Sequence, residues 1–144
     1  MLSLDKISDV FELLGDWEQR YQYLIELGEK LPDMPAEYMT DDNKVKGCMS
    51  QVWVHAYTEQ DDADILHYHG DCDTSIIRGV LAVLIQLVDS RTADEIQQLN
   101  VDELFARLNL DEHLSPNRHV GIYAIVELMK QQAREIKNQR AEVA

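Results

Sequence analysis

One almost uninterrupted apolar segment constrains the fold of this chain more than any other feature. From Thr74 onward, apolar side chains recur at helical spacing, and between positions 80 and 88 the one polar residue is Gln86. A helix that is hydrophobic on all sides must be covered by other elements of the protein. The run is too short to span a bilayer, which takes about 20 apolar residues. We therefore predict a central helix inside a folded domain.

The composition agrees with one domain built around such a helix. The chain has 144 residues, and 45% of them are hydrophobic, which suffices for the core of an ordinary domain. We predict a single domain over residues 1–144, with a polar C-terminal end that frays from about Gln131. The net charge is −14 and no basic cluster occurs, which argues against nucleic-acid binding. Residues 1–6 do not resemble the start of a signal peptide, so we expect a cytoplasmic protein without a membrane segment.

Three- and four-residue spacing of apolar side chains predicts helices before and after the strand-forming segment of the chain. The expected helices cover residues 4–14, 17–27, 74–88 and 101–108, with further helices beginning at Thr92 and near Asn117. Asp16 is the expected N-cap of the second helix. Thr92 with Glu95 forms a capping box, in which each residue satisfies a backbone N–H of the other.

Strand-like alternation occupies the middle of the chain. Residues 51–57 and 65–69 alternate between two faces, and a short strand through Val45 is expected to precede them. The resulting order is two helices, three strands and four helices, or ααβββαααα. Because strands and helices are segregated along the chain, we predict an α+β fold with a three-stranded antiparallel sheet packed against helices.

Cys48 is the strongest candidate for a reactive residue. It follows Gly47, directly before a strand, and its neighbours Lys44 and Lys46 are polar and basic. A free cysteine is often only a small buried hydrophobe, whereas a thiol at a loop tip can reach another protein's sulfur. Nearby lysines would favour the thiolate, which is the nucleophilic form. The residues alone leave the buried and the reactive interpretations open.

Several motifs together resemble the SufE family of sulfur acceptors, in order and over nearly the whole chain. They are Trp17-Glu18 through Tyr21, Leu27-Gly28 with Leu31-Pro32, Gly47-Cys48-Met49-Ser50-Gln51-Val52-Trp53, Gly70-Asp71-Cys72-Asp73, Ile77-Arg78-Gly79 and Leu114-Ser115-Pro116-Asn117-Arg118-His119-Val120-Gly121. The resemblance implies a SufE/NifU-like domain. Met49 and Cys72 depart from the family pattern, which usually has a polar and a serine-like residue at these positions.

The resemblance also implies a function. Family members take persulfide sulfur from a pyridoxal-phosphate-dependent cysteine desulfurase (SufS- or CsdA-like), activate that enzyme, and pass the sulfur to an iron–sulfur assembly scaffold (SufBCD-like). Cys48 lies at the acceptor position. Such a protein is a sulfur-transfer partner rather than an independent enzyme. It has no tightly bound cofactor and no metal, because the pyridoxal phosphate belongs to the desulfurase.

Other residues are expected to support the cysteine or to meet the partner. By the resemblance, this supporting set comprises Gly47, Gln51, Trp53, Asp71, Asp73 and Arg118. Gly47 is the natural hinge of a loop that swings outward. A simpler reading of the two aspartates is capping of the helix that follows them, and the alternative for Arg118 is an ordinary exposed arginine.

Two further groups admit both a functional and a structural interpretation. Cys72 is either a small residue before a helix or a second thiol that traps Cys48 as a disulfide or shares its sulfur. His55, His67 and His69 fall on one strand face, but their spacing matches no known metal site, so solvated histidines are the simpler reading.

Two rival functions remain at this stage. A scaffold on which clusters are built has a related fold but needs at least three good ligands, and only Cys48 lies in a motif. A regulatory module would activate a desulfurase without carrying sulfur. A cysteine protease or phosphatase is disfavoured, because no histidine partner can be assigned to Cys48 and no phosphate-binding loop follows it.

Overall fold

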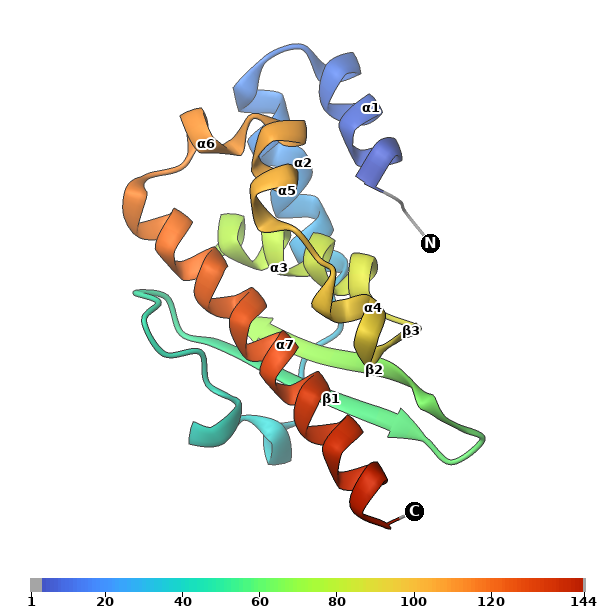
Figure 1. Ribbon diagram of the computed structural model, residues 1–144. Helices are drawn as coiled ribbons and strands as arrows, with labels where there is room; N and C mark the ends of the chain where they lie inside the picture. The colour runs from blue at the N-terminus through green and yellow to red at the C-terminus, as the bar shows by residue number, and fades with distance from the viewer. Residues whose placement is uncertain (1–3, 144) are drawn as a thin grey trace.

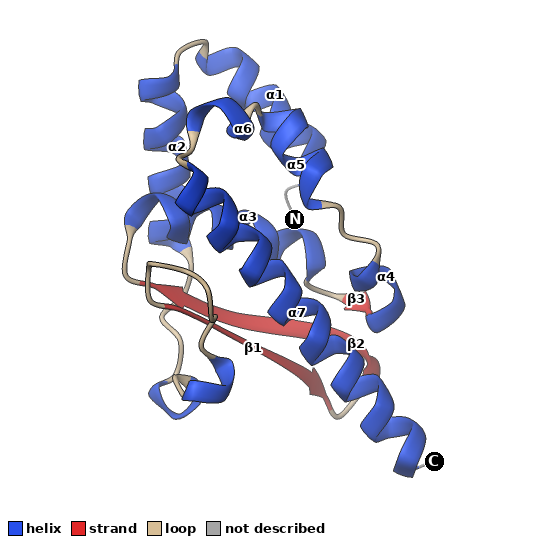
Figure 2. Ribbon diagram, turned by 60° about the vertical axis from the view of Figure 1, so that its left-hand side comes forward, coloured by secondary structure: helices blue, strands red, loops and turns tan. Residues whose placement is uncertain are grey.

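The computed structural model describes residues 4–143, with side chains described through Arg140. In this range the chain forms helices α1 (Leu4–Leu14), α2 (Trp17–Lys30), α3 (Ser75–Val88), α4 (Ala93–Gln97), α5 (Val101–Leu108), α6 (Leu110–His113) and α7 (Pro116–Val143), strands β1 (Val52–Glu59), β2 (Asp62–Cys72) and β3 (Arg91–Thr92), and the 3-10 turns η1 (Ala36–Tyr38) and η2 (Asp41–Asn43). Figures 1 and 2 show α7 running diagonally across the sheet. Helices α1, α2, α5 and α6 lie together at the upper end of both views.

The sheet is three-stranded and antiparallel, in the order β1-β2-β3, so the predicted fold class is confirmed. The third strand, however, is Arg91–Thr92 after α3, and not the expected segment at Val45. Near Val45 the chain makes only one isolated bridge, between Lys44 and Trp53, because Gly47 then turns the backbone away with a φ of 83°. A positive φ interrupts the extended conformation that a longer strand would need.

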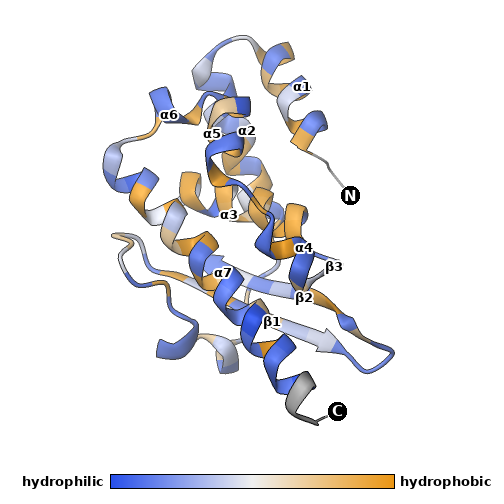
Figure 3. Ribbon diagram, viewed as in Figure 1, coloured by the Kyte–Doolittle hydropathy of each residue, from blue (hydrophilic) through white to orange (hydrophobic). Residues whose placement is uncertain are grey.

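Helix α3 is the centre of the molecule, as its apolar sequence predicts. It packs against α2, β2 and α7, and most of its side chains are buried. In Figure 3 its ribbon is largely orange, whereas the C-terminal half of α7 is mostly blue. No helix in the described part of the chain is long and apolar enough to cross a membrane.

Helices α2 and α3 approach each other closely at a pair of glycines, Gly28 and Gly79. A Cβ placed on Gly28 would lie 2.8 Å from the Gly79 backbone nitrogen, and one placed on Gly79 would overlap the Leu24 carbonyl group. Larger residues would therefore force the helices apart. Close packing here fixes the position of α3 and of the turn that leads into it.

Helix α7 covers β1 through its C-terminal half. Gln132 receives a hydrogen bond from Ala56 N at 2.9 Å and donates one to Val54 O at 2.9 Å, so it satisfies backbone groups of the edge strand. Ala133 is fully buried. The helix continues through Gln131 to Val143, and fraying of its polar end stays a prediction.

Both predicted helix N-caps occur in the structure. The Asp16 carboxylate accepts the Gln19 backbone N–H at 2.8 Å, and Thr92 with Glu95 forms a complete capping box. These caps satisfy backbone N–H groups that have no partner within the helix.

The glycine contact between α2 and α3 yields a stability prediction. Alanine in a helix interior is normally favoured over glycine by about 1 kcal/mol, but Gly79→Ala should instead destabilise the protein by about 2 kcal/mol or more, because its Cβ overlaps backbone atoms of α2. Urea unfolding measures the change. The control Glu12→Ala, on an exposed face of α1, should stay within about 0.5 kcal/mol. An unchanged or raised midpoint for Gly79→Ala would contradict the close approach.

Candidate functional site

Cys48 lies in an irregular loop, residues 46–51, that connects η2 to β1 and is called the Cys48 loop below. The loop lies near the beginning of α7 (Figure 1), and the thiol is partly exposed and free of any disulfide. Gly47, directly before it, has a φ of 83°, and a Cβ there would meet nothing within 4 Å. The glycine is therefore required by backbone conformation and not by crowding. Its use as a hinge stays a prediction.

The downstream end of the Cys48 loop is tied to the turn between β2 and α3. Gln51 N donates to the Asp73 carboxylate at 2.9 Å, and Asp73 N donates back to the Gln51 carbonyl oxygen at 3.1 Å. Beside this pair, the hydroxyls of Ser50 and Thr74 are 2.9 Å apart. Two of the predicted supporting residues, Gln51 and Asp73, thus act together and hold one end of the loop.

On its other side the thiol rests against helix α7. A Cβ on Gly121 would lie 2.8 Å from Cys48 Sγ, so the absence of a side chain there makes room for the sulfur. A hollow of about 190 Å³ opens beside the thiol, and we call it the Cys48 hollow. Besides Cys48 it is lined by Met49, Ser50, Ile77, Ser115, Asn117 and Arg118.

The surroundings of the thiol disfavour its ionisation. Burial raises the pKa of Cys48 above its ordinary value, a hydrogen bond from the Ser50 backbone partly offsets this, and the negative charge of Asp73 raises the pKa further. The expected stabilisation of the Cys48 thiolate by Lys44 and Lys46 is therefore not the dominant influence on its pKa. Lys44 instead lies over the Trp53 ring, with its Nζ 5.9 Å from the ring centroid. The resting Cys48 is mainly a neutral thiol.

Asp71 stabilises the fold behind the loop and does not cap α3. Its carboxylate forms an ion pair with Arg78 and accepts the backbone N–H groups of Cys72 at 2.8 Å and Met34 at 3.3 Å. The N-cap of α3 is Thr74, which makes no side-chain capping bond. The capping interpretation of the two aspartates is wrong because Asp71 still belongs to β2 and the Asp73 carboxylate is taken by the Cys48 loop.

Of the remaining predicted residues, Arg118 lines the Cys48 hollow and Trp53 does not. Arg118 is exposed and lines the Cys48 hollow. Trp53 pairs with Asp71 across the β1–β2 ladder and does not line that hollow. Gly121 and Thr74 are contacts that residue-level reasoning missed. Gly121 belonged to a recognised motif, but its contact with the thiol depends on how α7 packs, which local sequence does not report.

Cys72 ends β2 close to the Cys48 loop. It is buried, 6% exposed, and its ladder partner is Val52 at the start of β1. Its Sγ lies 3.5 Å from both the backbone N and the hydroxyl of Thr74. Burial raises the pKa of Cys72, the Thr74 hydrogen bonds lower it, and the charges of Asp73 and Cys48 raise it again. The two cysteines are therefore electrostatic neighbours.

The histidines form an aromatic cluster and not a metal site. Tyr38 stacks on His55 with ring centroids 4.2 Å apart, and Tyr57 lies 4.5 Å from His69. Within the described residues, no group of three or more His, Cys, Asp or Glu side chains could hold a metal ion. Burial and the neighbouring His69 lower the pKa of His55, which favours its neutral form, and the stacked rings serve as a packing surface.

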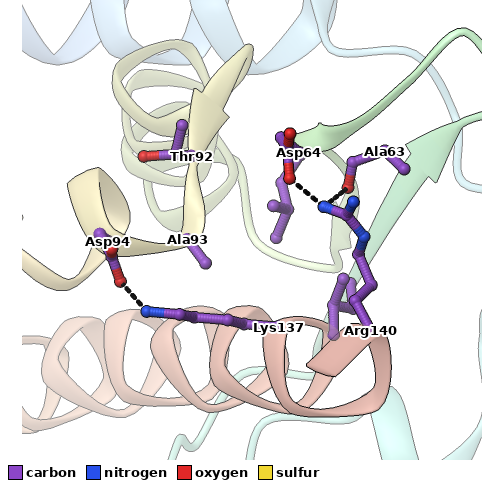
Figure 4. A pocket seen from close by; sticks show the side chains of 9 residues that line it. Ala63, Asp64, Thr92, Ala93, Asp94, Lys137 and Arg140 are labelled. Atoms are coloured by element: carbon purple, nitrogen blue, oxygen red, sulfur yellow. Dashed lines mark hydrogen bonds and ion pairs between the residues drawn. The ribbon is translucent and has the colours of Figure 1, made fainter. Parts of the chain in front are cut away.

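A larger hollow, of about 310 Å³, lies between α4, the β1–β2 hairpin and the C-terminal half of α7. Figure 4 shows its two cations paired across the opening, Lys137 with Asp94 and Arg140 with Asp64. None of the residues lining it is a cysteine or a histidine. It is therefore separate from the thiol chemistry.

Comparison with known proteins shows the family and the fold of this chain. The profile of the family described as "SufE: Fe-S metabolism associated domain" matches residues 5–133. An uncharacterised SufE-like protein of Rhizobium meliloti is 40% identical over 134 residues, covering 92% of this chain and 96% of that protein. One of Rhizobium etli is 41% identical over 135 residues, covering 93% and 91%. In fold, the chain is similar to the solution structure of a hypothetical protein from Thermus thermophilus, with a TM-score of 0.72, 18% identity, and coverage of 92% and 96%.

The electrostatic role of Asp73 yields a prediction about thiol ionisation. Asp73→Asn keeps an oxygen for the Gln51 N–H but removes a negative charge that raises the pKa of Cys48. In the Cys72→Ser background, alkylation of Cys48 by iodoacetamide should therefore reach its half-maximal rate at a lower pH. Glu59→Gln, the same loss of charge at the far end of β1, serves as the control and should leave the profile unchanged. A shift to higher pH in Asp73→Asn would contradict this assignment.

Proposed function

Because this chain belongs to the SufE family, which is associated with iron–sulfur metabolism, we propose that Cys48 accepts persulfide sulfur from a pyridoxal-phosphate-dependent cysteine desulfurase. The protein then delivers this sulfur for iron–sulfur cluster assembly. The observation that carries the proposal is the thiol itself, which is free, partly exposed and seated on a loop at the edge of the Cys48 hollow.

The proposed transfer is a thiol–persulfide exchange. The Cys48 thiolate attacks the terminal sulfur of a persulfide on the desulfurase cysteine, a new sulfur–sulfur bond forms on Cys48, and the desulfurase thiolate leaves with the electron pair of the broken bond. No net oxidation or reduction occurs. The rate depends on the thiolate fraction and the nucleophilicity of the attacking thiol.

The raised pKa of Cys48 fits a carrier that reacts only when docked. Burial is the first cause of that shift, so entry of the loop into a partner site that stabilises the thiolate would increase reactivity there. In isolation the neutral thiol reacts slowly with other electrophiles. Partial cover by α7 at Gly121 also shelters the sulfur.

The partner enzyme gains from this exchange as well. Removal of its persulfide frees the desulfurase cysteine for another turnover, so the carrier also activates it. The pyridoxal phosphate stays with the desulfurase, and the carrier itself needs no bound cofactor. A SufBCD-like assembly scaffold is the proposed recipient of the sulfur.

Intact-mass measurement tests the acceptor role. After incubation with a SufS-like desulfurase and cysteine, followed by rapid removal of both, the protein should gain the mass of one sulfur atom, and peptide mapping should locate it on Cys48. Cys48→Ser should gain none. Peptide mapping that finds the added sulfur elsewhere, or none on a folded protein, contradicts the proposal.

The same preparation separates the two rival functions. A regulatory module predicts that Cys48→Ser still accelerates cysteine turnover by the desulfurase, whereas a carrier predicts loss of that acceleration. A scaffold predicts a stable chromophore when the isolated protein is titrated with ferrous iron and sulfide without oxygen. The carrier proposal expects neither result.

A further inference from the structure

The two cysteines are joined by a short chain of polar contacts. The Ser50 backbone hydrogen-bonds Cys48, the Ser50 hydroxyl lies 2.9 Å from the Thr74 hydroxyl, and that hydroxyl lies 3.5 Å from Cys72 Sγ. Both sulfurs thus lie at the same end of the fold, around the first residues of α3.

The backbone can bring the sulfurs closer with a local movement. Val52, four residues after Cys48, is already the ladder partner of Cys72. A disulfide requires the two Cα atoms to lie about 4.4–6.8 Å apart. The movement required is a rotation of the backbone at Gly47, which has a positive φ and open space around the position of a Cβ, so that the first half of the Cys48 loop folds toward β2. The anchor between Gln51 and Asp73 can stay in place during this movement.

Burial raises the pKa of Cys72, but two hydrogen bonds from Thr74 partly offset this effect. The Thr74 backbone N–H and hydroxyl both lie at hydrogen-bond distance from its sulfur, and such donors stabilise a thiolate. Because Cys72 is 6% exposed, bulk reagents reach it with difficulty, whereas a sulfur delivered by the neighbouring loop does not need to cross solvent.

We propose that Cys72 is a resolving cysteine, which attacks the persulfide on Cys48 and releases its outer sulfur as sulfide. The inference rests on the proposed function, because that function supplies the persulfide. The Cys72 thiolate attacks Cys48 Sγ, the bond from that sulfur to the outer sulfur breaks, and hydrosulfide leaves with the electron pair. The outer sulfur is reduced, the two cysteine sulfurs are oxidised to a disulfide, and the Cys72 proton passes to solvent.

This reaction limits the lifetime of the persulfide on Cys48. A loaded protein that meets no recipient discharges sulfide and becomes an intramolecular disulfide that cannot accept sulfur again. A thiol reductant, such as a dithiol protein or a small thiol, is needed to restore the two thiols. Since burial raises the pKa of Cys72, little of it is thiolate near neutral pH and discharge is slow.

Comparison of the wild-type protein with Cys72→Ser tests the inference. Both are loaded with a SufS-like desulfurase and cysteine, freed of enzyme and small thiols, and followed by intact mass and by assay of released sulfide. Serine keeps a hydroxyl beside Thr74, and the thermal unfolding midpoint checks that the variant is folded. Both proteins should first gain one sulfur on Cys48.

The inference expects the persulfide to disappear at least about tenfold faster in the wild type than in Cys72→Ser, since the attack is intramolecular. One sulfide should be released per protein, and a monomer lacking two hydrogens should appear, with a Cys48–Cys72 crosslink in peptide mapping. Equal persulfide lifetimes overturn it, as does an added sulfur that moves intact to Cys72, or a disulfide between two protein copies. If neither protein ever gains sulfur, the proposed function itself fails.

An independent measurement removes the dependence on loading. Oxidation of the unloaded wild-type protein by diamide should give the same intramolecular crosslink, whereas Cys72→Ser should not lose two hydrogens as a monomer. Failure of the folded wild-type protein to form the crosslink overturns the inference whatever the desulfurase experiment gives.

Discussion

Arg78 holds together the parts of the chain that meet behind the Cys48 loop. Its guanidinium group donates to the carbonyl oxygens of Gly28 and Leu31, each at 2.8 Å, and forms an ion pair with Asp71. The end of α2, the end of β2 and the first turns of α3 are thereby fixed to one another. Breaking a largely buried pair of this kind leaves an uncompensated charge, which is strongly destabilising.

The position of the Cys48 loop depends on this fixed base. Asp73 follows the last residue of β2 and holds Gln51 through a reciprocal pair of hydrogen bonds, while Gly121 of α7 makes room for the Cys48 sulfur. One end of the loop is therefore anchored, and the other begins at Gly47, which has a positive φ and open space around the position of a Cβ. That asymmetry fits the proposed function, in which the thiol rests under partial cover and then enters the site of a desulfurase.

Sequence patterns predicted those features that depend on neighbouring residues. The apolar segment that became α3, the capping box at Thr92, and the positions of β1 and β2 all follow from local periodicity and capping chemistry. The third strand was misplaced because β3 has only two residues and is defined by its pairing with β2. Two residues are too few to show the alternation of apolar and polar side chains that predicts a strand.

In the candidate site, too, features set by neighbouring residues were predictable, whereas contacts between distant segments were not. Cys48 and Gly47 were identifiable from their motif, but the contacts that tune the thiol come from segments distant in sequence. The capping role expected for Asp73 was reasonable from its place before a helix, yet its carboxylate is taken by Gln51, 22 residues away. The support that α7 gives through Gly121 likewise depends on tertiary packing, which no local pattern encodes.

Transfer of radiolabelled sulfur in a single turnover would show whether Cys48 is the acceptor. A desulfurase loaded with one labelled persulfide from labelled cysteine, and then freed of substrate, is mixed with this protein in slight excess. If Cys48 is the acceptor, the label leaves the enzyme and appears in the peptide containing Cys48. Label that stays on the enzyme while the protein still accelerates steady-state cysteine turnover would contradict it.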